Sequence, residues 1–278
     1  DTLTALAHQA VDRAPDWLAD ALADNLGRMP VDKQDVFARL ILDAQDPIVD
    51  EVAFQVARLG IGPLTDARFS PALLVNNARL MYEHDKVLKY VEIVDTGSVA
   101  LGGDYSSTTR YQVSLPDDPT ATSWVEIPRD VYYWFIVHPK LSDETVKDSS
   151  EFSERESTYG YFWREYLFSN PNPGFDYSRD AGGGAAVYPV LGTVLAGPTV
   201  LWDGKAVDLP GGRPFTSTVA LDVVGNWVST MLPERAKATS KRPVEPNQIA
   251  YAHNGNCGEI QDLLGAASRT ALIPNVLT

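Results

Sequence analysis

Residues 251–274 read YAHNGNCGEIQDLLGAASRTALIP, which joins a turn signal to an apolar pattern with helical spacing. The Asn-Gly-Asn step at 254–256 predicts a turn, because Asn and Gly tolerate the backbone conformations that turns require. The residues after it predict a helix over 257–270 that begins at Cys257. Its buried stripe is expected to comprise Ile260, Leu263, Leu264 and Ala267.

Cys257 is the only cysteine among the 278 residues and is a candidate nucleophile. A thiol at a helix N-terminus faces unpaired backbone N–H groups and the positive end of the helix dipole, which favour the thiolate. The thiolate is the nucleophilic form, and the same N–H groups can hold the oxyanion of a tetrahedral intermediate. The alternative is a small buried hydrophobic side chain, since free cysteines are often fully buried.

Several features of this stretch together resemble the nucleophile motif of the transglutaminase-like superfamily. They are Gly-Asn-Cys-Gly-Glu at 255–259, the Leu263-Leu264 pair, Arg269 twelve residues after the cysteine, and the Ile273-Pro274 step. In that family a Gly-x-Cys turn opens the core helix, an Arg lies near the helix end, and an Ile-Pro step leads the chain toward a sheet. Another helix precedes the motif there, and residues 216–231 show a matching apolar period.

The resemblance implies an α+β, papain-like core with a Cys-His-Asp triad. In that family the thiolate attacks an amide carbonyl, an acyl-enzyme forms, and water or an amine removes the acyl group. The implied function is thiol-dependent acyl transfer or hydrolysis on a peptide or protein amide substrate. The alternative from another class is a non-catalytic binding or structural protein that retains a transglutaminase-like helix.

The resemblance also implies that the triad His and Asp follow the cysteine helix by some tens of residues. No His follows Cys257 in this sequence, so this chain alone is expected to be inactive. Three sources could complete the triad: a missing C-terminal part, a second chain, or a histidine already present. The four histidines are His8, His84, His138 and His253.

Three residues besides Cys257 are candidates for the cleft or the oxyanion side of the site. Asn256 directly precedes the nucleophile and either contacts the scissile amide or only shapes the turn. His253 is either the general base or a hydrogen-bonded loop residue, because the base of such sites normally projects from a separate element. Trp227 is either a core residue or part of a cleft wall. Arg269 is expected to be a structural anchor at the helix end.

The charge balance and the cysteine count exclude several classes of protein. The chain has 37 acidic and 23 basic residues, which gives a formal net charge of −14. This argues against nucleic acid as a partner, because binding to phosphate backbones depends on clustered Lys and Arg. A single cysteine cannot close an internal disulfide, so a disulfide-stapled scaffold is excluded.

The sequence predicts no cofactor and no metal. It contains no phosphate-binding loop, dinucleotide fingerprint or kinase signature, and its glycine-rich stretches lack the Lys and Ser/Thr of phosphate loops. A metal site built on His253, Cys257 and Glu259 would have too few convergent ligands, because zinc requires three or four from the protein.

The uncharged segment 181–202 is the only candidate for a membrane span. Its five glycines and two prolines would break a spanning helix, so irregular half-buried chain is expected and no membrane span. The chain starts with Asp1 rather than Met and contains no cysteine pair. These features fit an exported protein, periplasmic or extracellular, slightly better than a cytoplasmic one.

The sequence predicts an α+β protein with three regions. Residues 1–87 predict a helical bundle. Residues 88–185 predict a β-containing region with an acidic, serine-rich linker near 142–157. Residues 186–278 are expected to form a partial transglutaminase-like core that ends with the nucleophile helix 257–270.

Local signals specify some of these elements further. Asp32 is expected to cap a helix, and Ser70 to cap another whose first residue is Pro71. Short β-branched or alternating runs predict strands over 88–94, 109–115 and 123–127. The apolar run 131–137 fits a strand or a buried helix equally well, and the aromatic-rich run 159–168 is expected in the core.

Overall fold

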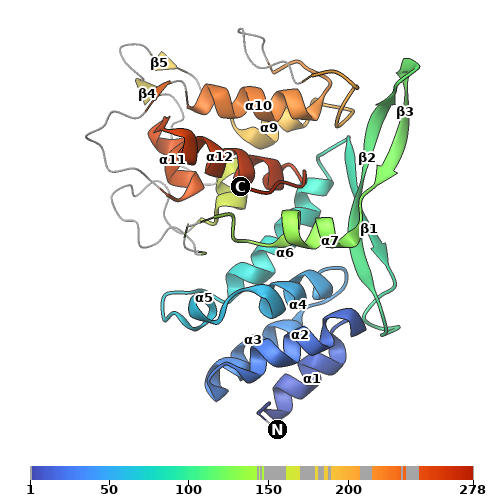
Figure 1. Cartoon of the computed structure of the whole chain (residues 1–278), viewed down its shortest axis with the longest axis vertical. Coiled ribbons are helices and arrows are strands. Elements are labelled where there is room, and N and C mark those ends of the chain that lie inside the picture. The colour runs from blue at the N-terminus through green and yellow to red at the C-terminus, as the bar shows by residue number, and fades with distance from the viewer. Residues whose placement is uncertain are drawn as a thin grey trace.

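The chain folds as an α+β protein, which confirms the predicted fold class (Figure 1). Helices form most of the molecule, and one three-stranded antiparallel sheet runs along one side of it. This computed structural model describes residues 2–142, 144, 146, 161–169, 179–180, 185–186, 189–206, 215–232, 234–235 and 244–277.

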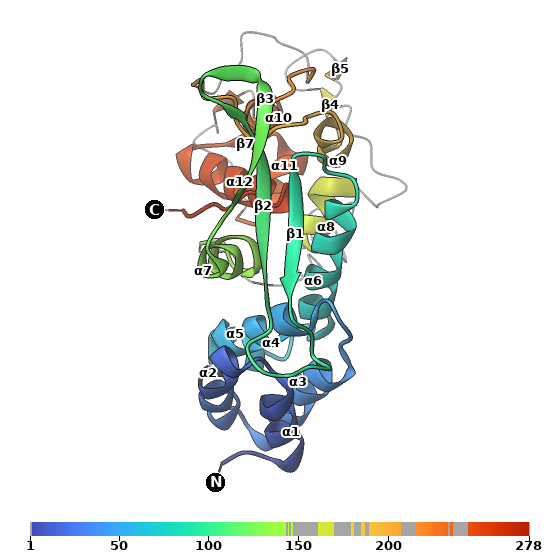
Figure 2. The same cartoon turned by 90° about the vertical axis from the view of Figure 1, so that its right-hand side faces the viewer.

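The end of the molecule that holds the N-terminus consists mainly of helices, and the prediction of helices over 1–87 is confirmed (Figures 1 and 2). Leucines spaced four residues apart on the second helix, from Leu18 to Leu26, are fully buried, as the helical period requires. The helices are α1 (Ala5–Arg13), α2 (Asp16–Gly27), α3 (Val31–Asp43), α4 (Val49–Arg58), α5 (Ile61–Thr65) and α6 (Ala72–Asp85).

Both predicted caps in this region are wrong. Helix α3 begins directly after Pro30, so Asp32 lies in its first turn, where the carboxylate still favours the helix dipole. Helix α6 begins at Ala72 with Pro71 as the N-cap residue, so the side chain of Ser70 is not the cap. In each case a proline, with its fixed φ, occupies the N-cap position, so α3 starts two positions before the expected start and α6 one position after it.

The sheet consists of β1 (Val91–Thr96), β2 (Ser106–Leu115) and β3 (Asp118–Glu126) in the order β1-β2-β3. The predicted strands are confirmed, although each differs by some residues at its ends.

Val91 lies opposite Tyr111 in the pairing of β1 with β2. The Tyr111 hydroxyl donates to Leu272 O at 2.6 Å, and the Tyr90 hydroxyl donates to Ala271 O at 2.8 Å. Residues at the sheet therefore bond residues 271–272, which directly follow the last helix of the chain.

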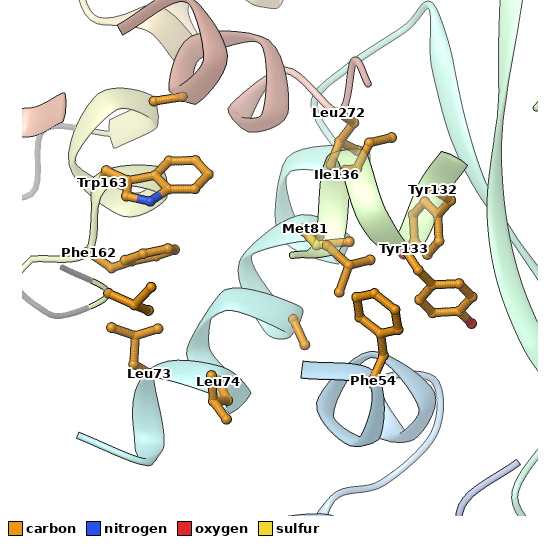
Figure 3. Close-up of a cluster of buried hydrophobic side chains, with 14 of the residues drawn as sticks. Phe54, Leu73, Leu74, Met81, Tyr132, Tyr133, Ile136, Phe162, Trp163 and Leu272 are labelled. Carbon is orange, nitrogen blue, oxygen red and sulfur yellow. The ribbon is translucent and has the colours of Figure 1, made fainter. Parts of the chain in front are cut away.

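The ambiguous apolar run at 131–137 is helical. It begins in α7 (Arg129–Tyr132) and continues as the π-helix η1 (Tyr133–Val137). Figure 3 shows Tyr132, Tyr133 and Ile136 in a buried cluster with side chains from α4, α6 and α8 (Trp163–Ser169). Trp134 is 42% exposed, so the solvent side of this helix also carries an apolar side chain, and the sequence has no polar–apolar period that could distinguish helix from strand.

The rest of the described chain surrounds the last helix, α12 (Cys257–Thr270). Helix α12 packs against α8, α10 (Ala220–Met231) and α11 (Pro246–Ala252), and α10 also contacts α9 (Leu191–Leu195). The aromatic run is in the core as predicted, since Phe162, Trp163 and Tyr166 are buried. Two short pairs complete the fold: β4 (Arg179–Asp180) with β5 (Ala185–Ala186), and β6 (Glu234–Arg235) with β7 (Asn254–Gly255).

Two sequence predictions concern segments that are only partly covered. Of the predicted linker near 142–157, only residues 142, 144 and 146 are described, and the remainder lies outside the described residues. Within the uncharged segment 181–202, the described helix is the five-residue α9. Among the described residues, no helix has the length and apolar character needed to cross a membrane.

Candidate functional site

The start of α12 places Cys257 at the first helical position, as predicted. Asn256 is the N-cap residue, and the Glu259 carboxylate accepts a hydrogen bond from Asn256 N at 2.6 Å. Together they form a capping box, in which the N-cap residue and the third residue of the helix bond reciprocally. The Asn-x-x-Glu spacing is a known sequence signal for this arrangement. The position of Cys257 is therefore fixed locally, by its two neighbours in the chain.

The residues before the N-cap differ from the predicted turn at 254–256. The chain reverses one residue earlier, at His253, which adopts the left-handed conformation with φ 51° and ends α11. Asn254 and Gly255 then pair with β6 in parallel. A Cβ added to Gly255 would lie 2.4 Å from the Glu259 Cβ. Glycine at 255 is thus required by the close approach of the capping side chain.

Cys257 is a free, exposed thiol, so the alternative of a buried hydrophobic cysteine is wrong. The capping box uses the N–H groups of Asn256 and Glu259. The N–H groups of Cys257 and Gly258 lie in the first turn, where a helix offers donors with no intrahelical partner. A carbonyl oxygen bound at this turn could reach both the thiol and these donors.

His253 is the nearest histidine to Cys257 in sequence, but it faces another partner. Its side chain is 5% exposed, and Nδ1 lies 3.0 Å from Met231 O. A carbonyl oxygen can only accept, so Nδ1 carries the proton and the ring is oriented by the end of α10. Within the described part of the chain, Cys257 Sγ makes no hydrogen bond to a histidine. The geometry thus supports the interpretation of His253 as a hydrogen-bonded structural residue.

Trp227 lies in the core. Its side chain is fully buried on α10, and Nε1 donates to Pro189 O at 2.8 Å. The indole thus satisfies its only polar group internally, as buried tryptophans generally do. Of the two interpretations of Trp227, the structure matches the core residue.

The other histidines are placed away from Cys257 as well. His84 is buried, stacks on Phe168 and has Nδ1 3.0 Å from Thr270 O, and burial lowers its pKa to about 3. Burial also lowers the pKa of His138 to about 4, and its ring stacks on Trp134. His8 is exposed on α1, at the opposite end of the molecule from α12 (Figure 1). All four histidines of the sequence therefore lack a direct bond to the thiol.

Arg269 is a structural anchor, as predicted. Its guanidinium donates to His138 O at 2.7 Å, Lys140 O at 3.0 Å and Asn275 O at 3.0 Å. Burial lowers its pKa to about 10. These bonds connect the end of α12 to residues 138–140 and to the chain that follows the helix.

Arg164 on α8 is a buried residue that sequence reasoning missed. It donates from Nε to Asn77 Oδ1 at 2.7 Å, from Nη2 to Ile136 O at 2.6 Å, and from Nη1 to Arg269 O. Burial lowers its pKa to about 9. The sequence did contain a signal, because Arg164 is a single cation inside an aromatic run that was expected in the core. A charge buried there needs several hydrogen-bond acceptors.

Among the described residues, no group of three or more His, Cys, Asp or Glu side chains is placed so that it could hold a metal ion.

Comparisons of this chain with protein-family models, with curated proteins and with solved structures found no match. The functional argument therefore rests on the residues and their geometry.

Proposed function

We propose that this chain carries the nucleophile part of a transglutaminase-like, papain-type core, in which Cys257 attacks the amide carbonyl of a peptide or protein substrate. The observation that carries the proposal is an exposed thiol at the first position of a helix whose start is fixed by a capping box. Sequence resemblance over 251–274 supports the same assignment. A reactive cysteine needs access and an electropositive surrounding, and a helix N-terminus supplies both.

The chemistry assigned to Cys257 is acyl transfer. The thiolate sulfur bonds to the carbonyl carbon, the C–N bond breaks, and the amine leaves with a proton from a general acid. The resulting thioester then passes its acyl group to water or to a second amine, which restores the thiol. The first-turn N–H groups of Cys257 and Gly258 are the donors proposed for the oxyanion.

The general base is proposed to come from residues other than those of this chain. The four histidines of this chain do not bond to Cys257, and three of them are buried or held by other partners. A further C-terminal part of the protein or a second chain would therefore supply the triad His and Asp. This chain by itself is proposed to be inactive in turnover.

The reactivity of the thiol tests the proposal directly. The single cysteine allows the rate of alkylation by iodoacetamide to be measured at about pH 6, where a free thiol is nearly all protonated. We expect Cys257 to react faster than glutathione under the same conditions. Cys257→Ser should abolish labelling, and urea-unfolded protein should react at the glutathione rate. A native rate no higher than that of glutathione would remove the physical basis for a nucleophile.

Substrate turnover separates the proposal from its alternative. A longer protein, extended beyond residue 278, should release ammonia or amine from glutamine-containing peptides and lose this activity in Cys257→Ser. The alternative is a non-catalytic binding or structural protein, which the absence of a histidine bonded to Cys257 favours. An extended protein that encodes no His or Asp able to complete the triad would establish that alternative.

A further inference from the structure

A cluster of acidic and hydroxyl side chains lies where α4 meets α6, the sheet and the helix 129–137. Asp50 and Glu51, neighbours on α4, have exposed fractions of 3% and 0%. No Lys, Arg or His side chain in the described part of the chain bonds either carboxyl. Asp50, Glu51 and the five side chains that bond or connect them are here called the acid–tyrosine cluster. The five are Tyr82, Asp95, Ser107, Tyr132 and Tyr133.

The contacts around Glu51 contain too few hydroxyl protons for an ionised carboxylate. The Tyr132 hydroxyl donates to Glu51 Oε1 at 2.8 Å. The Tyr82 oxygen lies 3.0 Å from the same Oε1 and 2.6 Å from Asp95 Oδ1. A phenol has one proton and can donate only once. If Tyr82 donates along its shorter contact, to Asp95, the proton for the contact with Glu51 must come from Glu51 itself.

Asp50 is connected to the same exposed acid through a second hydroxyl. Tyr133 donates to Asp50 Oδ2, and Ser107 Oγ lies 2.9 Å from that oxygen and 3.0 Å from Asp95 Oδ1. Ser107 also has a single proton. Two hydroxyls therefore bridge Asp95 to both buried carboxyls, and their two protons serve only two of these four contacts.

The burial of Glu51 supports the same protonation state. Desolvation raises the pKa of Glu51 well above its usual value, and the charge of Asp50 raises it further. Desolvation also raises the pKa of Asp50, while hydrogen bonds from Tyr133 and Ser107 oppose this increase. Glu51 Oε2 is buried without a hydrogen-bond partner. A neutral carbonyl oxygen tolerates such a position far better than an anionic oxygen does.

We propose that the folded protein keeps one proton on Glu51 at neutral pH, that Tyr82 and the exposed Asp95 connect this proton to solvent, and that its loss at alkaline pH weakens the attachment of α4 to the sheet and to the helix 129–137. The acid–tyrosine cluster is thus a pH-sensitive latch between the N-terminal helices and the rest of the molecule. Its bonds join α4 to α6, to strands β1 and β2, and to the helix 129–137.

Other titratable groups near the latch are few. Asp85 on α6 accepts a hydrogen bond from Ile93 N, and burial raises its pKa to about 6. The Tyr105 hydroxyl donates to Arg13 O, and Asp46 accepts from Val99 N. Above about pH 7, Asp85 is mostly ionised in the folded protein, because its pKa of about 6 lies below that range. Arg164, whose folded pKa is about 9, also titrates there, so the proton on Glu51 is measured by comparing the wild type with Glu51→Gln, which share Arg164.

The sign of the pH dependence follows from the direction of the shift. The folded state binds the Glu51 proton more tightly than the unfolded state, whose carboxyl titrates near the usual value of 4.5. Between that value and the higher folded pKa, unfolding releases one proton. The unfolding equilibrium constant should then rise about tenfold per pH unit, so stability falls as pH rises.

Urea unfolding between about pH 7 and pH 9 measures this proton. We expect the unfolding equilibrium constant of the wild type, divided by that of Glu51→Gln, to rise close to tenfold per pH unit. Glu83→Gln, the same exchange at an exposed position on α6, should keep the wild-type dependence. A ratio of wild type to Glu51→Gln that does not change with pH overturns the proposal.

Infrared spectroscopy of the wild type locates the proton even where Glu51→Gln fails to fold. At neutral pH we expect a carbonyl band of a protonated carboxylic acid that shifts when the Glu carboxyls carry ¹³C and does not shift with labelled Asp. A missing band, or one that shifts only with labelled Asp, excludes Glu51 as the carrier. Hydrogen exchange then tests the latch: between about pH 7 and pH 9, the protection of α4 and residues 129–137 should fall more in the wild type than in Glu51→Gln. Equal protection in both contradicts the latch.

Discussion

Two arginines hold the middle of the molecule together through neutral oxygens rather than through carboxylates. Arg164 bonds Asn77 Oδ1 and two backbone carbonyls, and one of these carbonyls belongs to Arg269. Arg269 in turn bonds the carbonyls of His138, Lys140 and Asn275. A planar guanidinium presents five donors in fixed directions, so it can satisfy several carbonyls that no helix or sheet uses.

Replacing Arg164 by Met should therefore be strongly destabilising. The change keeps the apolar stem but leaves Asn77 Oδ1, Ile136 O and Arg269 O without this donor in a buried place. We expect a loss of about 3 kcal/mol in the free energy of unfolding, measured in urea. Arg79→Met removes an exposed arginine paired with Glu83 and should change stability by less than about 1 kcal/mol. Similar losses for the two variants would show that Arg164 is not an anchor.

Single residues differed in how far the sequence could predict them. Cys257 was predictable because its helix position depends on neighbours in the chain, namely the Asn-x-x-Glu capping pattern. The predicted buried stripe of that helix was only partly right, since Leu263 and Ala267 are buried but Ile260 is 41% exposed. Asp50 and Glu51 were not, because two acids in the first turn of a helix normally face solvent and favour the helix dipole. Their burial results from tyrosines that arrive from α6 and from residues 132–133.

At the scale of elements, the pair α6 and α12 is joined through His84. Its ring stacks on Phe168 of α8 at 3.6 Å, and Nδ1 faces Thr270 O at the end of α12. Burial and the charge of Arg164 lower the pKa of His84 to about 3. The folded protein therefore keeps this histidine neutral, while the unfolded chain takes up a proton near pH 6.5.

Acid should weaken the contact made by His84. Its folded pKa is depressed below the unfolded value, so its contribution to stability is present above about pH 6.5 and is lost as pH falls. Between about pH 8 and pH 5 we expect the unfolding equilibrium constant of the wild type to rise about thirtyfold relative to His84→Gln. Comparison of the two proteins in urea cancels the groups they share, such as His138 and Glu51. A ratio that does not change with pH would show that His84 is protonated in the folded protein.

Element boundaries were predicted best where a single local rule determined them. The bounds of α12 agree with the predicted helix 257–270 because a capping box starts it. Helices α3 and α6 begin elsewhere than predicted because prolines, rather than Asp32 or Ser70, occupy their N-cap positions. The run 131–137 could not be assigned, since even its exposed residue, Trp134, is apolar and the sequence therefore shows no period.

At the scale of the whole molecule, the sequence predicted the α+β class but not the way its parts are joined. Composition and period are local properties, and they indicated helices first and strands after them. The joints are long-range polar bonds: Tyr90 and Tyr111 to the chain after α12, and the acid–tyrosine cluster between α4 and the sheet. A tyrosine in a strand pattern reads only as a strand-former, so its distant partner had no signal in the sequence.

The two ends of α12 should therefore respond differently to changes in the sheet. The Tyr111 hydroxyl fixes Leu272 O after the helix, whereas the capping box fixes Cys257 at its start, about 20 Å away at 1.5 Å per residue. Tyr111→Phe should lower the free energy of unfolding by about 1 kcal/mol and raise hydrogen exchange in residues 271–277. The native alkylation rate of Cys257 should stay at the wild-type value, while Gly255→Ala, which crowds the Glu259 Cβ, should change it. A reduced alkylation rate in Tyr111→Phe would mean that the sheet, and not the local cap, positions the thiol.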